Sequence, residues 1–216
     1  MRNKEKDAAE MAVKRQNMIE TAFRIFSENS IDAVTMPDIA KECGYGIATL
    51  YRYFNTKMAL VVAVGTWAFE QYTAINWRHL NEVGFKQMTA FEEYEAFLDS
   101  FIDLYRNHKE LLRFNQFFNI YIAGAEVESE QMKPYMNLIK TIISGFHSIY
   151  EKAKADGTLR TDISETVIFS SSLHLMLAAT TRYAVGLVYL SDRKQPETEL
   201  LLLKKMLLQE YAGKTK

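Results

Sequence analysis

The sequence predicts an all-α protein in which a short three-helix, helix-turn-helix domain precedes a larger helical domain. Three prolines and nine glycines in 216 residues leave few points at which long helices would break. No run of residues alternates between apolar and polar at the period of a strand, whereas apolar residues recur at helical spacing along most of the chain. The hydrophobic share of 48% is ample for a core.

Residues 34–57 predict two short helices joined by a glycine-bearing turn. Thr35 is a good N-cap, Asp38 three residues later completes a capping box, and Pro37 falls in the first turn, where its missing N–H costs nothing. Gly44 suits the left-handed conformation that ends a helix. A second apolar stripe follows at helical spacing: Ile47, Leu50, Tyr51 and Phe54. Two helices this short are stable only when they pack on each other and on a third element, which is the logic of a helix-turn-helix.

The third element is a helix predicted over residues 9–29. Its apolar stripe is formed by Ile19, Ala22, Phe23 and Phe26. Basic side chains outnumber acidic ones in residues 1–15. Two interpretations fit this segment: a solvated and partly frayed arm, which is usual for a terminus, or an arm that lies near DNA phosphates.

Helices are predicted through the rest of the chain. A fourth helix over residues 57–82, ended by Gly84, follows the helix-turn-helix without a linker rich in Pro, Gly or Ser. A continuous helix of this kind can pass a movement between the two predicted domains, residues 1–57 and 58–216. Five further helices are expected, over residues 89–106, 108–123, 130–155, 163–190 and 197–211.

Four motifs stand at fixed spacings within residues 15–60. They are Ala22-Phe23-Arg24-Ile25-Phe26, Thr35-Met36-Pro37-Asp38-Ile39-Ala40, Gly44-Tyr45, and Thr49-Leu50-Tyr51-Arg52-Tyr53-Phe54 followed by Lys57. In this combination the stretch resembles the N-terminal DNA-binding domain of TetR/AcrR-type transcriptional regulators. The resemblance implies an all-α regulator that binds double-stranded DNA through this domain and a small molecule through the C-terminal ligand-binding and dimerisation domain.

In such a regulator the start of the second short helix faces the major groove, which admits an α-helix. Thr49 then bonds a phosphate or a base edge, and Ile47 and Ala48 pack on thymine methyls. The hydroxyls of Tyr51 and Tyr53 suit phosphate oxygens, although both side chains also fit a core. Lys57 at a helix start favours a phosphate. The predicted DNA-binding residues are Thr35, Gly46, Ile47, Ala48, Thr49, Tyr51, Arg52, Tyr53 and Lys57.

The second domain is dense in aromatic residues, most of which are expected to form its core. The resemblance implies that some also line an apolar ligand pocket between helices. The candidates that share one predicted helix are Phe114, Phe117, Phe118 and Tyr121. His147 and His174 are the candidate polar groups of such a pocket, and the alternative for each is a core histidine with a satisfied ring.

Residues 167–190 are apolar almost all round and long enough to span a bilayer. Arg182 in the body and the lack of a flanking basic cluster argue against insertion. Together with the final helix, this stretch favours a homodimer through about residues 163–211, built as a twofold-symmetric four-helix bundle. Two recognition helices one DNA turn apart would then read a palindromic operator.

The sequence contains no catalytic or cofactor-binding pattern, so we expect neither enzyme activity nor a cofactor. The four histidines and Cys43 lack metal-ligand spacing, and there is no nucleophile elbow, phosphate loop or dinucleotide fingerprint. Cys43 is expected to be a small core residue rather than a redox switch. The single cysteine and the absence of an apolar signal segment favour a cytoplasmic protein that is not inserted in a membrane.

The sequence therefore predicts a DNA-binding transcriptional regulator. We expect a repressor that an apolar or amphipathic small-molecule inducer releases from a palindromic operator. The alternative is a regulator that activates transcription. A second hypothesis is a helical small-molecule carrier or sequestering protein that no longer reads DNA. Gly46 and Ile47, at positions where polar groups are expected, and the nearly balanced charge of residues 1–57 favour that alternative. A third is a regulator tethered to a membrane through residues 167–190.

Overall fold

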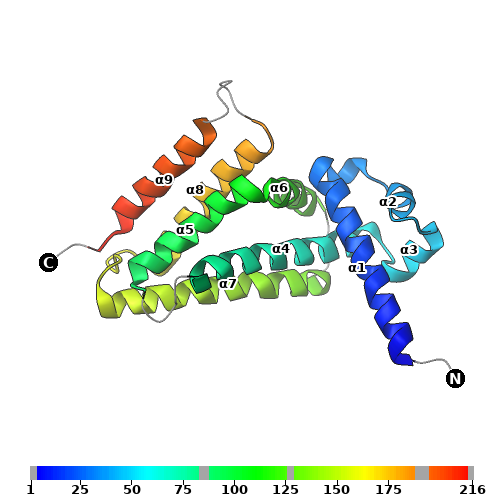
Figure 1. Cartoon of the computed structure of the whole chain (residues 1–216), viewed down its shortest axis with the longest axis horizontal. Coiled ribbons are helices and arrows are strands. Elements are labelled where there is room, and N and C mark those ends of the chain that lie inside the picture. Colours follow the sequence, from blue (N-terminus) through cyan, green and yellow to red (C-terminus); the bar gives the residue numbers. More distant parts are fainter. Residues whose placement is uncertain (1–3, 83–87, 126–128, 188–194, 214–216) are drawn as a thin grey trace. The chain divides into compact units, whose positions relative to one another are not determined.

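The computed structural model describes residues 4–82, 88–125, 129–187 and 195–213. In this part of the chain the elements are α-helices and one short 3-10 helix, which confirms the all-α prediction (Figure 1). In chain order they are α1 (Lys4–Glu28), η1 (Ile31–Ala33), α2 (Met36–Glu42), α3 (Ile47–Tyr53), α4 (Lys57–Glu82), α5 (Ala90–Asn107), α6 (Lys109–Ala123), α7 (Ser129–Asp156), α8 (Glu165–Ala184) and α9 (Gln195–Tyr211).

The chain packs as two compact units. The first unit consists of residues 1–69 and 113–136, and the second of residues 70–112 and 137–216. The helix-turn-helix therefore shares its unit with the start of α4 and with parts of α6 and α7. The functional division between residues 57 and 58 that the sequence indicates is a separate matter and stays a prediction.

Local signals in the sequence determine the ends of α2 and α3. The Thr35 hydroxyl accepts a hydrogen bond from the Asp38 amide at 3.3 Å, and the Asp38 carboxylate accepts one from the Thr35 amide at 2.9 Å, so the predicted capping box is confirmed. Gly44 has φ of +72°, the left-handed conformation predicted for the turn between the two helices. Gly46 in extended backbone then precedes the first turn of α3.

The core of the first unit is built on α1. Its predicted stripe, Ile19, Ala22, Phe23 and Phe26, is buried. The Phe23 ring lies 5.0 Å from the ring of Trp67 in α4 and 5.3 Å from that of Phe114 in α6, between ring centroids. Aromatic pairs at this spacing add to the free energy of burial. α1 is thereby joined to α4 and α6.

A close approach of α4 and α6 depends on Gly65. A Cβ atom built at this position would lie 2.5 Å from Cε2 and 2.7 Å from Cζ of Phe118. Phe118 is 2% exposed, and its ring stacks on Phe114 and packs against Tyr135, at centroid distances of 5.6 and 5.1 Å. The ring of Phe118 thus occupies the space that any side chain at position 65 would need.

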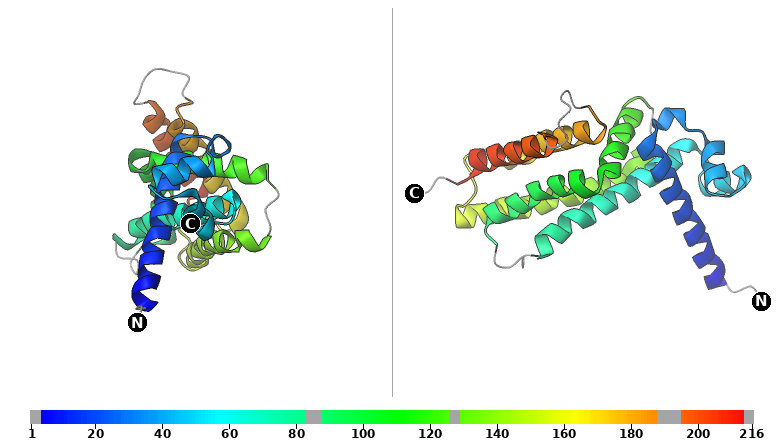
Figure 2. Two further views of the ribbon diagram at one scale, coloured as in Figure 1. Left: turned by 90° about the vertical axis from the view of Figure 1, so that its right-hand side faces the viewer. Right: turned by 45° about the horizontal axis from the view of Figure 1, so that its top comes forward.

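In the second unit α5 packs against α8 and α9, and these two pack on each other (Figure 2). The hydroxyls of Tyr94 in α5 and Ser172 in α8 are 2.7 Å apart and both side chains are fully buried. Burial raises the pKa of Tyr94, so this hydroxyl stays protonated. The Lys204 ammonium of α9 lies 2.6 Å from Asp99 and 2.8 Å from Glu95 of α5.

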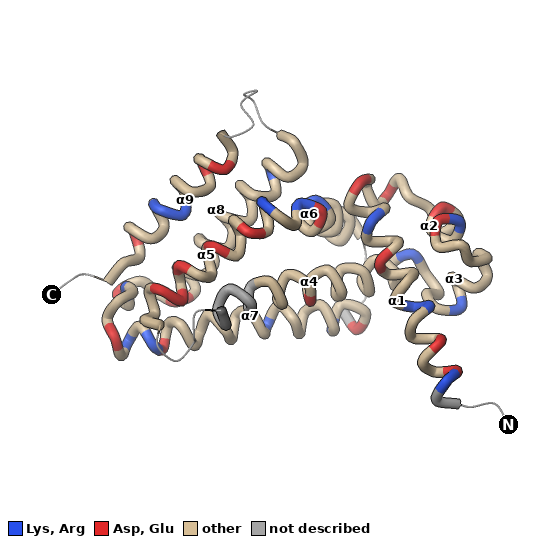
Figure 3. Tube along the Cα trace, in the orientation of Figure 1, with Lys and Arg blue, Asp and Glu red and all other residues tan. Residues whose placement is uncertain are grey.

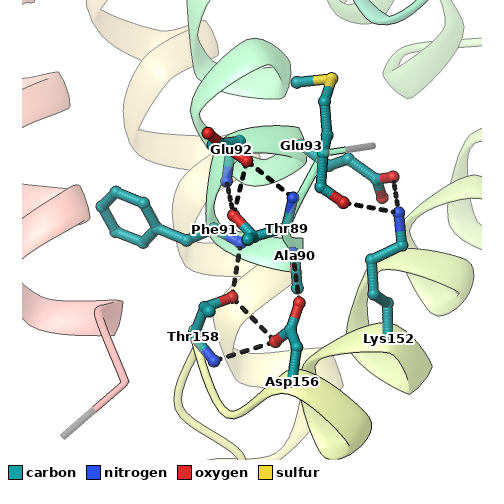
Figure 4. Close-up of polar contacts among 9 residues, drawn as sticks. Thr89, Ala90, Phe91, Glu92, Glu93, Lys152, Asp156 and Thr158 are labelled. Carbon is teal, nitrogen blue, oxygen red and sulfur yellow. Dashed lines mark hydrogen bonds and ion pairs between the residues drawn. The ribbon is translucent and has the colours of Figure 1, made fainter. Parts of the chain in front are cut away.

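The start of α5 is capped from two directions (Figure 4). Thr89 forms a capping box with Glu92, and the Asp156 carboxylate at the end of α7 accepts a hydrogen bond from the Ala90 amide at 2.8 Å. The Thr158 hydroxyl accepts another from the Phe91 amide at 3.1 Å. These contacts satisfy amides that a helix N-terminus leaves without partners.

Beside this cap, Lys152 of α7 forms an ion pair with Glu93 of α5 (Figure 4). The Glu93 side chain is 1% exposed, and the ammonium also donates to the Met88 carbonyl at 3.1 Å. A buried carboxylate is tolerated when it is paired and hydrogen-bonded.

Main-chain hydrogen bonds join the end of α9 to the segment that follows α7. The Arg160 amide donates to the Tyr211 carbonyl at 2.9 Å, and the Gly213 amide donates to the Thr158 carbonyl at 2.8 Å, around an isolated bridge between Leu159 and Ala212.

Two predicted helix boundaries were wrong. α1 begins at Lys4 rather than near residue 9, because Ala8 and spaced charges continue the helical pattern on the N-terminal side of the first core residue. α8 ends at Ala184 rather than near residue 190, because Gly186 at φ of +82° turns the chain. The predicted helix end at Gly84 lies outside the described residues.

By length and composition, one described stretch is apolar enough to cross a membrane, and it is Lys57–Ile75 in α4 rather than residues 167–190. Leu60, Val61 and Val64 within it are fully buried in the protein. A packed core helix meets the same criteria.

Candidate nucleic-acid interface and effector residues

α3 presents one face that the rest of its unit leaves open. Ile47 is 39% exposed and Tyr51 47%, and Ala48 and Arg52 are exposed beside them. These residues are four apart in pairs, so they form a single stripe on the helix. The opposite side holds α3 in place through Leu50, which is fully buried, and through Phe54, which follows the last turn. The exposed stripe combines two apolar groups with a phenol and a guanidinium.

Other predicted DNA-binding residues border this stripe. Gly46 is exposed at the N-cap of α3, and Thr49 and Tyr53 are half-buried. Thr35 is exposed, but its hydroxyl and amide are engaged in the capping box of α2. The structure thus brings Gly46, Ile47, Ala48, Tyr51 and Arg52 together on one surface and gives Thr35 a role inside the unit. Their contacts with DNA stay predictions.

Lys57 makes contacts within its own unit. Its Nζ donates a hydrogen bond to the Ile31 carbonyl at 2.5 Å and lies 5.5 Å from the centroid of the Tyr121 ring. Burial lowers the pKa of the Lys57 ammonium. Thr56 caps the start of α4, since its hydroxyl accepts a hydrogen bond from the Ala59 amide at 3.0 Å. The phosphate contact stays a prediction.

Charges of both signs are interspersed along α1 to α3 (Figure 3). Arg24 of α1 pairs with Glu42 of α2. The Arg15 guanidinium of α1 lies 5.1 Å from the centroid of the Phe54 ring, at the end of α3. Nearly balanced charge means that affinity for a polyanion depends on where the cations lie rather than on their number.

Arg113 is a contact that no local pattern in the sequence indicates. Its Nε donates to the Ser27 carbonyl in the last turn of α1 at 3.1 Å, across 86 residues of sequence. Phe114, the next residue of α6, contacts Phe23 of α1. Only a long-range comparison of positions that vary together would have found this pair.

The predicted effector residues are divided between the two units. Phe114 and Phe118 are 1% and 2% exposed and pack on aromatic rings of the first unit, while Phe117 and Tyr121 are half-buried. Burial raises the pKa of Tyr121. These placements show an aromatic core, and the ligand contacts of the four residues stay predictions.

His147 and His174 belong to the second unit. His147 is 58% exposed by its side chain, and its Nδ1 lies 2.9 Å from a Glu165 carboxylate oxygen. The hydrogen bond and charge of Glu165 raise the pKa of His147. His174 is exposed on α8. Neither imidazole is enclosed by its own unit, so neither residue is a buried core histidine.

Apolar side chains are also exposed along α8 and α9. Leu202 and Met206 of α9 are 56% and 57% exposed, and Val167 and Leu175 of α8 are 51% and 48% exposed. The inner faces of the same helices are buried at Ile168, Ser172, Met176, Leu200 and Leu207.

Cys43, at the end of α2, is half-buried, and burial raises the pKa of its thiol. Among the residues that the structure describes, no three His, Cys, Asp or Glu side chains gather as metal ligands would.

The sequence of the first unit has a recognisable family pattern. Residues 18–64 match the model of the bacterial regulatory proteins of the tetR family. An HTH-type transcriptional regulator of Staphylococcus aureus strain MRSA252 is 32% identical over 108 residues, which are 50% of this chain and 55% of that relative. Another, from strain USA300, is 26% identical over 193 residues, 87% of this chain and 96% of the relative.

Solved structures share the fold over nearly the whole chain. The ketosteroid transcriptional regulator KstR2 of Mycobacterium tuberculosis superposes with a TM-score of 0.66 at 14% identity, covering 93% of this chain and 95% of its own. The fatty acid degradation regulator FadR of Bacillus halodurans gives a TM-score of 0.69 at 14% identity, over 90% and 94%.

Proposed function

Because the chain belongs to the tetR family of bacterial regulatory proteins, which bind DNA and regulate transcription, we propose that it is a repressor released from a palindromic operator by an apolar or amphipathic small molecule. Its place of action is the cytoplasm, where the DNA is.

The observation that carries the proposal is the open face of α3. A helix of seven residues is about 10 Å long at 1.5 Å per residue and fits the width of the major groove. Ile47 and Ala48 suit thymine methyl groups, Arg52 suits guanine or a phosphate, and Tyr51 suits a phosphate oxygen. Thr49, Tyr53 and Gly46 border this surface and complete the proposed contact set, together with Thr35.

The proposed dimer uses the exposed apolar face of α8 and α9. Lys204 holds the inner face of α9 on α5, so the outer face with Leu202 and Met206 is available to a second copy. Apolar faces of this kind associate as a four-helix bundle with twofold symmetry. The homodimer through about residues 163–211 then carries two copies of α3, as a palindromic operator requires.

The proposed effector site lies in the C-terminal ligand-binding part, residues 58–216. Two solved structures of the same fold are described as a ketosteroid transcriptional regulator and a fatty acid degradation regulator, and apolar ligands of these classes suit the many aromatic side chains here. Phe114, Phe117, Phe118 and Tyr121 of the first unit are proposed ligand contacts, and His147 and His174 of the second unit are separate candidates. If the effector binds one arrangement of the dimer more tightly and DNA binds the other, linkage requires that the effector weaken DNA binding.

Binding to the DNA that flanks the chain's own gene, followed by fluorescence anisotropy at several salt concentrations, tests the proposal. We expect Arg52→Met to weaken binding and to lower the slope of log affinity against log salt by about 0.9, the contribution of one phosphate. Lys133→Met removes a solvent-exposed cation of the same unit and serves as the control. Absence of any sequence-specific, salt-sensitive binding by the unmodified protein refutes the proposal.

The alternative is a helical carrier that keeps the effector site and no longer reads DNA. The balanced charge of α1 to α3 and the bare Gly46 favour it. A small molecule that stays bound through purification, in a protein that binds no duplex, identifies the carrier. Mass spectrometry of the extracted ligand is the measurement.

A further inference from the structure

Two cations from different helices hold the turn between α1 and α2. Arg113 of α6 donates to the Ser27 carbonyl at 3.1 Å, and Lys57 of α4 donates to the Ile31 carbonyl at 2.5 Å. Ser27 and Ile31 are 3% and 1% exposed, so water has little access to these residues. The segment from 27 to 33 is called the α1–α2 turn below.

Each cation lies where the backbone carries partial negative charge. Ser27 is in the last turn of α1, where carbonyls lack helical partners and the helix dipole favours a positive group. The Ile31 carbonyl accepts a second bond from the Val34 amide at 3.3 Å, so both of its acceptor sites are used. Hydrogen bonds from charged donors are stronger than those between neutral groups.

Both anchors depend on α6. Arg113 and Phe114 contact α1 directly, at Ser27 and Phe23. Eight residues further along, Tyr121 places its ring 5.5 Å from the Lys57 ammonium. A shift of α6 along or away from α1 therefore changes the surroundings of both cations together.

The α1–α2 turn in turn sets the place of the DNA-reading helices. Val34 and Met36, which follow it at once, are 6% and 4% exposed, so the start of α2 is packed directly behind the turn. α2 and α3 contact each other across the tight turn at Gly44. A displacement of the α1–α2 turn is thus transmitted to the exposed face of α3 by packed elements rather than by a loose loop.

We propose that Arg113 and Lys57 are positioning residues for DNA recognition, because they hold the α1–α2 turn and, through it, the place of α3. Lys57 then acts on a carbonyl of its own chain and not on a phosphate. The proposal rests on the proposed function, because it concerns how that DNA-reading surface is regulated.

The first test compares DNA affinity and its salt dependence for Arg113→Met and Lys57→Met with the unmodified protein. We expect each variant to bind about 2- to 30-fold more weakly, the range for residues that modulate coupling without touching a ligand, with an unchanged salt slope. Lys133→Met should match the unmodified protein in both quantities. Arg113→Lys keeps a cation within reach of Ser27 and should fall between the unmodified protein and Arg113→Met.

A salt slope lower by about 0.9 in Lys57→Met shows a phosphate contact and overturns the proposal for that residue. Unchanged affinity in both Met variants overturns it for the turn as a whole. Circular dichroism at the assay temperature establishes that each variant is folded, and Arg113→Lys replaces Arg113→Met in the comparison if the latter is not.

The second test does not involve DNA. Hydrogen–deuterium exchange of the peptide covering residues 27–36 should be faster in Arg113→Met than in the unmodified protein and unchanged in Lys133→Met. Equal exchange in all three overturns the anchoring. If the unmodified protein binds no DNA, the proposed function fails, while the exchange result still decides whether the two cations hold the turn.

Discussion

Replacement of Gly65 by alanine tests the contact between α4 and α6 with a single added carbon. The new Cβ would lie 2.5 Å from the nearest atom of the Phe118 ring, whereas carbon atoms in favourable contact are about 3.5–4.0 Å apart. The ring must therefore move by about 1 Å. Phe114 and Tyr135 pack against it and restrict that movement.

Two opposing terms decide the size of the effect. Overpacking a well-packed core costs about 1–3 kcal/mol, and alanine in place of glycine inside a helix stabilises by about 0.5–1 kcal/mol. We expect Gly65→Ala to lower the free energy of unfolding by about 1 kcal/mol overall. Gly145→Ala in α7 is the matched control, because a Cβ there meets no atom within 4 Å and only the helical gain applies.

Denaturation by urea, followed by circular dichroism, measures both variants. A double-mutant cycle with Phe118→Leu isolates the clash, since the smaller side chain should relieve it and give a coupling energy of about 1–3 kcal/mol. Both positions of the cycle lie in the first unit, so its result does not depend on the comparison with Gly145 in the second unit. If Gly65→Ala stabilises the protein as much as Gly145→Ala does, α4 and α6 do not approach as described.

Three further predictions concern the second unit. Ser172→Ala should cost about 1–3 kcal/mol by leaving the buried Tyr94 hydroxyl without its partner, and adding Tyr94→Phe should recover part of the loss in the same urea assay. Lys152→Met should cost about 3–5 kcal/mol by leaving the Glu93 carboxylate buried and unpaired, with recovery on adding Glu93→Gln; a loss no larger than that of a surface lysine contradicts the burial. The pKa of His147 is raised in the folded state, so its contribution to stability is full below the ordinary pKa of 6.5 and is lost as pH rises through the folded-state pKa. The stability difference between the unmodified protein and His147→Gln should therefore shrink as pH rises above 6.5. Unfolding measured across a pH series gives this difference.

The features of the fold that the sequence predicted correctly rest on local chemistry. Thr35 and Asp38 are three residues apart and cap each other, and Gly44 takes the left-handed turn that its missing side chain allows. α8 was predicted too long because apolar residues continue past its last turn, and periodicity alone cannot distinguish an apolar turn from a helix.

The parts of the site that the sequence did not predict depend on partners far along the chain. Lys57 reads locally as a cation at a helix start, but its hydrogen-bond acceptor, the Ile31 carbonyl, is 26 residues away. Arg113 reads as one more charged residue of α6, and its partner Ser27 is 86 residues away. Phe114 and Phe118 read as aromatic residues of one helix, and only the packed structure shows which rings they meet. The exposed face of α3, by contrast, follows from helical spacing alone.

The link between the end of α9 and the segment after α7 has a consequence for how this sequence can diverge. Its hydrogen bonds run from main chain to main chain, so most substitutions along it leave every donor and acceptor in place. Position 213 is different, because a Cβ there would lie 1.9 Å from the Gly157 carbonyl oxygen. Homologues that keep this link are therefore free to vary at Leu159 and Ala212 in ways that preserve packing, but should retain glycine at 213. An aligned set of distant relatives would show an isolated invariant position near a variable C-terminus, and its cause would be steric rather than functional.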